Sequence, residues 1–332
     1  MSSIFDRFEL ASFKRLYNNA KSVAKRNNKF TLAVLFDMAN CILKDHVGYM
    51  EYNLFNFVNK PQKLRDTYVT FDYSQYLFKT LNDPEGIKLF NSKLAFNKIF
   101  KNYIGRDFLD ISNSSFEEFK KFVKKKKMIF SKPDDSCSGQ GIYQNYVINK
   151  DTNLEGLYNF LKENNLFVED CIIQHQTMNK LHPSSINTIR VCTLVKDNKA
   201  HVMYALQRIG INGMKVDNVG AGGIYTVLSD KGEIINPCWS DKTISTYTVH
   251  PSTKMNLIGF KVPHFKEALK LCKKAALVVK NVRYVGWDIA ITKDGPIIVE
   301  GNPLPGYDMP QNYFVTNKDT GLKPDFEEIL NG

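Results

Sequence analysis

The sequence has no long run of apolar residues, and this absence is the first limit on the class of protein. Nowhere does it approach 18 consecutive apolar side chains, so no membrane-spanning helix is expected. The N-terminal segment contains Asp6 and Glu9 and has no apolar core, unlike a secretory signal peptide. We therefore expect a cytoplasmic protein, with peripheral binding at the inner face of the membrane as the other location that fits.

Paired cysteines and common nucleotide-binding motifs are also missing. The six cysteines are scattered without CxxC spacing, and a chain of this length folds without disulfides, so we expect reduced thiols. GxxxxGK[ST] is absent and no GxGxxG opens a helix, which excludes the P-loop and the dinucleotide fingerprint. Zinc-finger spacing and RNA-binding aromatic motifs are absent too, so no nucleic-acid partner is expected.

Positive charge is in excess, with 45 Lys and Arg against 34 Asp and Glu and a net charge of +11. This excess favours an anionic partner but does not indicate a fold. Part of it comes from the run FKKFVKKKK at residues 119–127. The run fits the solvated end of a helix, where cations meet the negative end of the helix dipole. Binding to a polyanion or an acidic membrane surface is the alternative.

The order of the predicted elements indicates an α+β fold in three parts. Residues 1–90 are predicted to be helical, and the turn residues NDPEG at 82–86 mark a boundary. Residues 91–170 combine helices with two short strands that flank a loop of small residues. Residues 171–332 contain antiparallel hairpins and one long helix. Because helices and antiparallel strands come in separate blocks, the pattern favours α+β over a doubly wound parallel sheet.

The last predicted hairpin, at residues 286–303, brings three oxygen-bearing side chains together. Asp288 lies in its first strand, and Glu300 and Asn302 lie at the end of its second. Mg²⁺ prefers oxygen ligands and binds through a few carboxylates together with substrate phosphates. Two facing carboxylates also repel without a cation, so a metal explains the arrangement. An exposed hairpin with incidental acids is the alternative, but these acids interrupt apolar runs.

The turn of this hairpin predicts its register. A three-residue loop at residues 293–295 would pair Thr292 with Pro296. The same register would pair Asp288 with Glu300, with their Cβ atoms about 5 Å apart on one face.

Two further segments have residues suited to binding an anion. Lys132 ends a predicted strand, and the small-residue loop after it can point backbone N–H groups at a phosphate, although such loops are often only turns. Arg190 and Arg208 lie on neighbouring predicted strands, and their planar guanidinium groups suit phosphate or carboxylate recognition. Two surface arginines on a sheet are the alternative. The histidines at 175 and 182 lack metal-ligand spacing, so we do not expect a zinc site.

Taken in order, these segments resemble the ATP-grasp superfamily, and most of all its sugar-transfer-associated branch, which is often encoded with genes for capsular or other surface polysaccharides. The resemblance covers residues 49–311. It depends on five stretches in the family's order: NSKLAFNKIF, KPDDSCSGQGI, FVEDCIIQHQTMNKLHPSSINTIRV, the VDN and AGG pair, and VGWDIAITKDGPIIVEGNPLPG. It implies two α+β subdomains that hold ATP between them, at residues 91–170 and 171–332, after a helical N-terminal region.

The resemblance also implies roles for individual residues. Lys93 and Lys132 correspond to the two lysines that contact nucleotide phosphates, and Glu169 corresponds to the hinge acid near adenine or ribose. The loop at residues 136–141 corresponds to a mobile flap over the phosphates. The implied nucleotide-binding residues are Lys93, Lys132, Ser136, Ser138, Gly139, Gly141, Glu169, Asp170, Ile172 and Asn187, the ligands of Mg²⁺ (or Mn²⁺) are Asp288, Glu300 and Asn302, and the catalytic residues are Arg190 and Arg208.

Two positions depart from the family's pattern. The flap has only Gly139 and Gly141, fewer glycines than many relatives have. Gly286 stands where peptide-forming relatives, such as D-alanine:D-alanine ligase, have an arginine that helps to hold the acyl intermediate. The second departure leaves the substrate open.

The activity that the resemblance implies is an ATP-dependent carboxylate–amine ligase. ATP phosphorylates a carboxylate, and an amine then displaces phosphate to form an amide. The family's context indicates a sugar acid or sugar nucleotide as the carboxylate, an amino acid or amino alcohol as the amine, and polysaccharide-assembly enzymes as partners. An ATP-grasp kinase that acts on a sugar hydroxyl, and a non-catalytic nucleotide- or polyanion-binding protein, are the alternatives.

Overall fold

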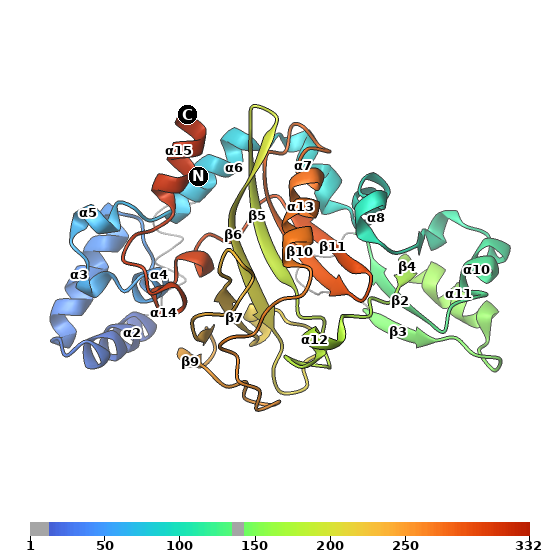
Figure 1. Ribbon diagram of the computed structural model, residues 1–332, viewed down its shortest axis with the longest axis horizontal. Coiled ribbons are helices and arrows are strands. Elements are labelled where there is room, and N and C mark those ends of the chain that lie inside the picture. Colours follow the sequence, from blue (N-terminus) through green and yellow to red (C-terminus); the bar gives the residue numbers. More distant parts are fainter. Residues whose placement is uncertain (1–12, 135–142) are drawn as a thin grey trace.

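The computed structural model describes residues 13–134 and 143–332. Figure 1 shows three parts along the longest axis: N-terminal helices at one end, a large sheet in the middle and a small sheet with two helices at the other end. Helices and antiparallel strands are both abundant, so the predicted α+β class is confirmed.

The large sheet has seven strands in the order β11-β10-β5-β6-β7-β8-β9, and every neighbouring pair is antiparallel. Its three central strands read as nearly continuous apolar runs because both faces of the sheet are covered. The strands are β5 (Ile189–Lys196), β6 (Lys199–Ile209), β7 (Ile224–Val227), β8 (Cys238–Ser240), β9 (Ser245–Tyr247), β10 (Tyr284–Thr292) and β11 (Gly295–Asn302), with the short helix η3 (Val219–Ala221) before β7.

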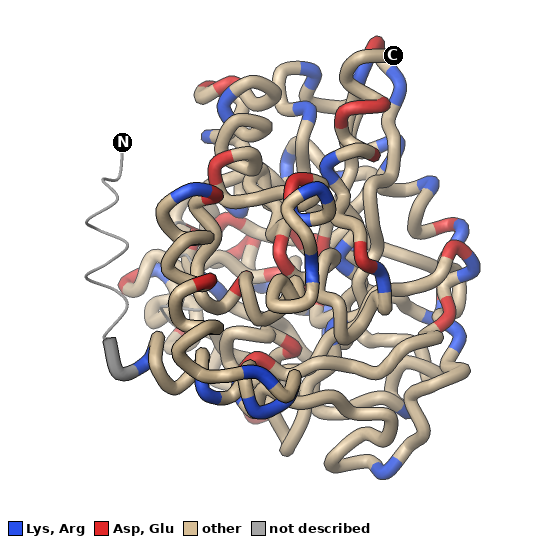
Figure 2. The backbone as a smooth tube through the Cα atoms, turned by 90° about the vertical axis from the view of Figure 1, so that its left-hand side faces the viewer, with Lys and Arg blue, Asp and Glu red and all other residues tan. Residues whose placement is uncertain are grey.

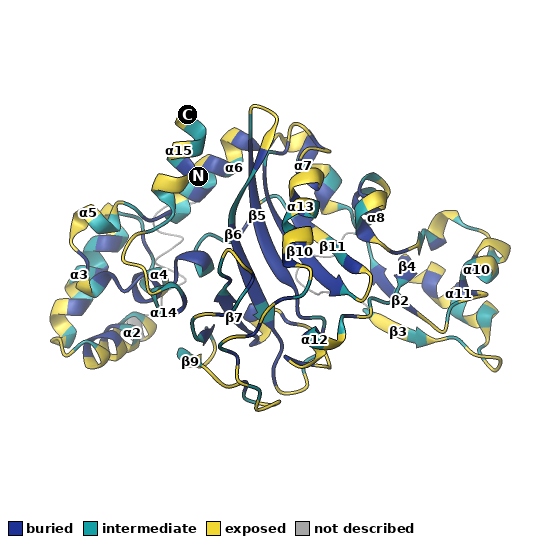
Figure 3. Ribbon diagram, viewed as in Figure 1, coloured by how far each residue is buried: buried dark blue, intermediate teal, exposed yellow. Residues whose placement is uncertain are grey.

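Alternate residues of the large sheet enter two different cores. Val191 and Trp287 belong to the core on one face, which also contains apolar residues of α13 (Phe265–Ala275). Leu194 and Leu206 belong to the core on the other face, together with the N-terminal and C-terminal helices. The strands between these layers are dark in Figure 3, which colours buried residues blue. The period-two alternation of side chains therefore gives one sheet two separate apolar layers.

The small sheet has the order β1-β4-β2-β3, also fully antiparallel. It packs one face against α10 and α11 around a third, smaller core that includes Ile129, Val168 and Leu161. The elements of this part are β1 (Phe108–Leu109), η2 (Ile111–Asn113), α10 (Phe116–Val123), β2 (Met128–Pro133), β3 (Gln144–Val147), α11 (Leu154–Glu163) and β4 (Leu166–Asp170).

Short helices make up the rest of the described chain. Figure 2 looks onto the end of the molecule that the N-terminal helices form. None of the helices in residues 13–134 and 143–332 is long and apolar enough to cross a membrane. These helices are α2 (Phe13–Arg26), α3 (Thr31–Lys44), α4 (Tyr49–Leu54), η1 (Phe57–Asn59), α5 (Gln62–Arg65), α6 (Phe71–Leu81), α7 (Pro84–Asn91), α8 (Lys93–Ile99), α9 (Lys101–Ile104), α12 (Gln176–Asn179), η4 (Met309–Gln311), α14 (Tyr313–Thr316) and α15 (Lys323–Asn331).

Candidate active site

The register of the β10–β11 hairpin differs from the prediction near its turn. Thr292 pairs with Gly295 and not with Pro296, so the loop has two residues and the predicted three-residue loop is wrong. The pairing of Asp288 with Glu300 is nevertheless confirmed. The register shifts between Asp288 and Ile289, because one extra residue of β11, Val299, is accommodated in a β-bulge. The turn is one residue shorter than predicted and the bulge adds one residue to β11, so Asp288 and Glu300 keep the predicted pairing.

The three predicted metal ligands lie together at the end of this hairpin. Asp288 is only 2% exposed, whereas Glu300 is exposed and Asn302 is half-buried. The Asn302 Nδ2 group donates a hydrogen bond to Glu300 Oε1 at 3.4 Å, which leaves the Asn302 amide oxygen for another partner. Although Glu300 keeps contact with solvent, the surrounding protein and then the Asp288 carboxyl raise the pKa of Glu300.

Two arginines place positive charge beside Asp288, in addition to the cation that the facing carboxylates predict. Arg190 binds both carboxylate oxygens of Asp288 through Nε and Nη2, and Arg208 Nη2 lies 2.8 Å from Asp288 Oδ2. Burial alone would raise the pKa of Asp288, but Arg190 and Arg208 outweigh it and hold that pKa far below its ordinary value. The two arginines therefore balance the charge of Asp288 in the absence of a metal, and the metal site at Asp288, Glu300 and Asn302 stays a prediction.

Arg208 is oriented by a further acid that the sequence did not indicate. Its Nε and Nη2 groups donate to Thr188 Oγ1 at 3.0 and 2.6 Å. Thr188 in turn donates its N–H and its hydroxyl to Asp217 Oδ2 at 2.7 and 2.6 Å. Asp217 belongs to the VDN stretch, which is part of the family resemblance but predicts no role for this acid. This chain of contacts fixes the guanidinium of Arg208 beside Asp288.

The donor set fits Mg²⁺. Among the described residues no group of three or more His, Cys, Asp or Glu side chains could hold a metal ion. The group around Asp288 has two carboxylates and reaches three oxygen ligands only with the Asn302 amide. Because Arg190 and Arg208 occupy much of the Asp288 carboxylate, Glu300 and Asn302 are the better-placed ligands for a hard cation.

Lys132 and Glu169 form a buried ion pair in the small sheet. Lys132 Nζ lies 2.7 Å from Glu169 Oε1, and Arg106 Nε lies 3.0 Å from Glu169 Oε2. Asn97 Nδ2 donates to the same Oε2 at 3.1 Å, and all four side chains are buried. Burial would raise the pKa of Glu169, but Lys132 and Arg106 outweigh it and lower that pKa to about 2. Two predicted nucleotide-binding residues are thus in direct contact.

Arg106 also reaches the bulge that positions Glu300. Its Nη1 group donates to the carbonyl oxygen of Ile298 at 2.7 Å, and its Nη2 group donates to that of Val299 at 2.9 Å. Successive carbonyls of a regular strand point to opposite edges, so one guanidinium reaches both only where the strand is irregular. Arg106 follows Gly105, whose positive φ of 56° and close approach to Ile297 require glycine.

Lys93 lies at the first position of α8, beside the residue that precedes the predicted flap. The Lys93 ammonium donates to the carbonyl oxygen of Asp134 at 3.3 Å. The Asp134 carboxylate accepts from the Leu94 N–H at 2.7 Å and from the Ser92 hydroxyl at 2.9 Å, so it helps to cap α8. The predicted loop residues Ser136, Ser138, Gly139 and Gly141 lie outside the described residues.

The remaining predicted residues have different surroundings. Asp170 pairs with Lys126 at 2.5 Å, and Ile172, two residues after the end of β4, is partly exposed. The side chain of Asn187 points into its own loop, where Nδ2 donates to the carbonyl oxygens of Met178, His182 and Ser185 at distances from 2.7 to 3.3 Å. Among the described residues, this amide group makes no hydrogen bond to another predicted nucleotide-binding residue.

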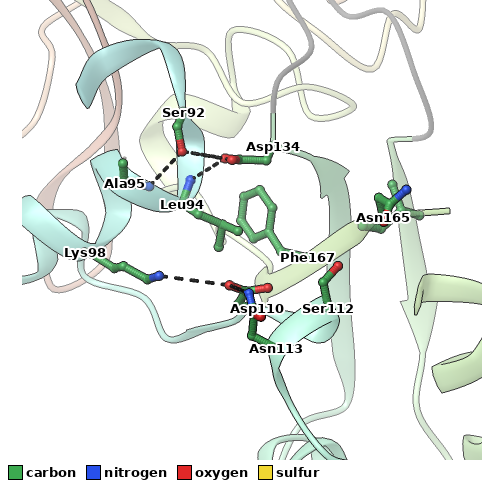
Figure 4. Close-up of a pocket in the computed structure, with 11 residues that line it drawn as sticks. Ser92, Leu94, Ala95, Lys98, Asp110, Ser112, Asn113, Asp134, Asn165 and Phe167 are labelled. Atoms are coloured by element: carbon green, nitrogen blue, oxygen red, sulfur yellow. Dashed lines mark hydrogen bonds and ion pairs between the residues drawn. The ribbon is translucent and has the colours of Figure 1, made fainter. Parts of the chain in front are cut away.

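A cavity of about 560 Å³ lies between α8, η2 and the beginning of β4. Figure 4 shows Ser92 and Asp134 on one side of it and the Lys98–Asp110 pair on the other. None of the predicted site residues that the structure describes lines it. It nevertheless adjoins them, because Phe167 lines the cavity and Lys132 Nζ lies 5.3 Å from the centre of the Phe167 ring.

Comparison with known proteins places the chain in a family. A family model described as sugar-transfer associated ATP-grasp matches residues 72–329, a stretch that starts and ends later than the resemblance at 49–311. No curated protein matches.

Solved structures of ATP-grasp enzymes are similar at low identity. They include the ATP-grasp ligase PsnB with minimal precursor, Mg and ADP (14% identity, TM-score 0.42, covering 76% of this chain and 61% of PsnB). D-alanyl-alanine synthetase A from Vibrio cholerae has 13% identity and a TM-score of 0.44, with 75% of this chain and 66% of that chain covered. D-alanine–D-alanine ligase from Bacillus anthracis has 14% identity and a TM-score of 0.42, with 78% and 74% covered.

Proposed function

The chain belongs to the sugar-transfer-associated ATP-grasp family, and we propose that it is an ATP-dependent carboxylate–amine ligase that forms an amide through an acyl phosphate. The observation that carries the proposal is the pair of arginines that Asp288 holds side by side. In the described part of the chain, the Nη1 group of neither arginine has a hydrogen-bond partner, so both can donate to an anionic ligand. Two guanidinium groups placed in this way suit the recognition of a carboxylate and of the phosphoryl group that the carboxylate receives.

The nucleotide would lie between the small sheet and the large sheet. Lys93 and Lys132 would supply positive charge to its phosphates, and Glu169, Asp170 and Ile172 would line the base or ribose. The loop residues 136, 138, 139 and 141 would contribute backbone N–H groups. Asn187 would not contact the nucleotide directly, but would fix the conformation of the loop that leads into β5.

The chain's own residues would position the reactants and neutralise charge, without a covalent enzyme intermediate. Glu300 and Asn302, with the Asp288 carboxylate behind them, would hold Mg²⁺ or Mn²⁺. When bound, the metal supplies positive charge at the terminal phosphates of ATP. Arg190 and Arg208 would orient the substrate carboxylate for attack on the terminal phosphorus and then hold the acyl phosphate until the amine arrives.

The substrate class that we propose comes from the family's context, since Gly286 by itself leaves the substrate open. A Cβ atom at Gly286 would lie 3.1 Å from Arg190 Cδ and 3.1 Å from Pro305 Cβ, so a side chain there would displace the arginine. Arg190 thus occupies the space next to the position from which peptide-forming relatives extend their arginine. We propose a sugar acid or sugar nucleotide as the carboxylate, an amino acid or amino alcohol as the amine, and a cytoplasmic role beside polysaccharide-assembly enzymes.

The test is the stoichiometry of products in a screen of uronic acids and amines with ATP and Mg²⁺. We expect one ADP and one inorganic phosphate for each amide, with the amide identified by mass spectrometry. Glu300→Gln is the matched control, because it removes a metal ligand on the surface of the hairpin and should lower turnover by orders of magnitude without unfolding the protein. Phosphate that stays on a sugar hydroxyl would contradict the ligase and favour a kinase. Unchanged turnover in Glu300→Gln would remove the triad from the mechanism.

A further inference from the structure

Helix α3 (Thr31–Lys44) is apolar on two opposite faces. It buries Val34, Met38 and Cys41 against the rest of the molecule. Its other face exposes large apolar side chains at a spacing that places them in one stripe: the exposed fractions are 75% for Leu32, 72% for Phe36 and 57% for Leu43. Phe30, which precedes the helix, is 87% exposed. We call these four residues the α3 stripe. Exposed apolar side chains gathered in this way mark a contact surface.

The two helices α2 and α3 form a helical hairpin, and this α2–α3 hairpin is also strongly basic. Residues 13–44 contain seven Lys and Arg and one acid, a formal charge of +6 against +11 for the whole chain. The one acid, Asp37, is already paired with Arg65 at 2.7 Å. Lys29 and Lys44 bracket the stripe in sequence, and both are exposed. The basic residues are Lys14, Arg15, Lys21, Lys25, Arg26, Lys29 and Lys44.

We infer that the α2–α3 hairpin binds the surface of a membrane that contains acidic lipids. Exposed Phe and Leu side chains enter the boundary between headgroups and acyl chains, while flanking lysines stay with the phosphates. Basic residues near such a surface each add to the attraction, which salt weakens. A second copy of the chain fits less well, because a two-fold interface would bring two surfaces of +6 together.

The position of the hairpin leaves the candidate active site accessible. Figure 1 places α2 and α3 at the end of the molecule opposite the small sheet, with the large sheet between them. Figure 2 views this end directly. The basic run at residues 119–127 lies at the other end of the molecule, in and after α10, so it is a separate basic segment from the one beside α3. This inference does not depend on the proposed reaction.

Flotation of the full-length protein with lipid vesicles tests the inference. We expect binding to phosphatidylcholine vesicles that contain phosphatidylglycerol, little binding to phosphatidylcholine alone, and weaker binding as salt rises. The double variant Leu32→Ser/Phe36→Ser and the variant Lys25→Ala/Lys29→Ala should each reduce binding at least ten-fold. The matched control Lys121→Ala/Lys124→Ala/Lys125→Ala removes exposed lysines from the opposite end and should bind like the wild type.

The outcomes separate the possible occupants of the stripe. Failure of the wild type to float with the anionic vesicles would overturn the inference. So would loss of binding in the Lys121/Lys124/Lys125 control while the Leu32/Phe36 variant still binds. A wild-type dimer that Leu32→Ser/Phe36→Ser converts to a monomer would show that a second copy covers the stripe, and would also overturn it. Because the substituted side chains are exposed, unchanged thermal unfolding of each variant confirms that the fold is intact.

Discussion

At the scale of single residues, the candidate site is organised around two buried acids, each held by two cations. Glu169 is held by Lys132 and Arg106, and Asp288 is held by Arg190 and Arg208. A buried carboxylate without such partners would be costly, because burial disfavours its charged form. The cations therefore keep both acids ionised, and the acids in turn fix the positions of the cations. This mutual arrangement means that the basic side chains are oriented before any ligand binds.

Glu169→Gln should lower the free energy of unfolding by about 3 kcal/mol near neutral pH, because it leaves Lys132 and Arg106 buried without their acid. The sign of the pH dependence follows from the lowered pKa. The ordinary value of 4.5 falls to about 2 in the folded protein, so the stabilisation is present in full above pH 4.5. It is lost as the pH falls towards 2. Denaturant unfolding of both proteins from pH 7 downwards measures this, and a difference that stays constant to pH 2 would contradict the prediction.

The sequence could identify residues that share one hairpin but not those that meet through the fold. Asp288, Glu300 and Asn302 lie within fifteen residues of one another, so strand alternation together with an assumed turn predicted that they meet. Arg106 and Asp217 are near neighbours of the site because separate elements pack together. Nothing in the local sequence marks Arg106, and Asp217 is marked only as part of the VDN stretch, without a role. For the same reason the sequence could not show that Asn187 faces its own loop.

At the scale of elements, the bulge in β11 determines which residues face one another. A two-residue turn with a regular ladder would pair Asp288 with Val299, and Glu300 would point to the opposite face. The extra residue restores the pairing of the two acids. The turn could be located from the Asp-Gly sequence, but its length could not, because two- and three-residue loops both accommodate a glycine with positive φ. The sequence could not predict the bulge, because its stabilising contacts come from Arg106, which lies far away in the sequence, between α9 and β1.

Arg106→Lys should weaken the binding of ADP with Mg²⁺ at least ten-fold, while binding of ADP without Mg²⁺ should change less. The lysine keeps a positive charge near Glu169, but its single nitrogen replaces the three nitrogens with which Arg106 reaches Glu169 and the carbonyls of Ile298 and Val299, so the bulge loses support. Titration calorimetry with and without Mg²⁺ measures both affinities.

Asn97→Ala is the matched control, because Asn97 contacts Glu169 and accepts a long hydrogen bond from Arg106 Nη2, but makes no hydrogen bond to the bulge in the described part of the chain. This variant should retain the effect of Mg²⁺ on ADP binding. If Arg106→Lys and Asn97→Ala lose the same amount of affinity, Arg106 supports the cluster around Glu169 only, and its link to Glu300 has no consequence.

At the scale of the whole molecule, the N-terminal helices are part of the body that contains the large sheet. Tyr68, which precedes α6, shares a core with Leu206 of β6 and Phe326 of α15. The C-terminal segment closes over this region, since Gln311 accepts from the Val69 N–H at 2.8 Å and donates to the Val69 carbonyl at 2.9 Å. The sequence predicted the helices at residues 1–90 but not this shared core, because apolar residues do not reveal which surface they will cover.

Tyr68→Ala should therefore destabilise both faces of the large sheet together, by about 3 kcal/mol or more. The protein has two tryptophans, and they report on different faces: Trp239 lies in the core that contains Tyr68, and Trp287 lies in the core on the other side. Single-tryptophan backgrounds, Trp239→Phe and Trp287→Phe, allow each fluorescence signal to be followed through denaturant unfolding. We expect Tyr68→Ala to move both midpoints by the same amount, because the strands between the two cores unfold as one unit. Tyr76→Ala, at an exposed tyrosine of α6, should move neither. A shift of the Trp239 signal alone would show instead that the N-terminal helices unfold as a separate domain.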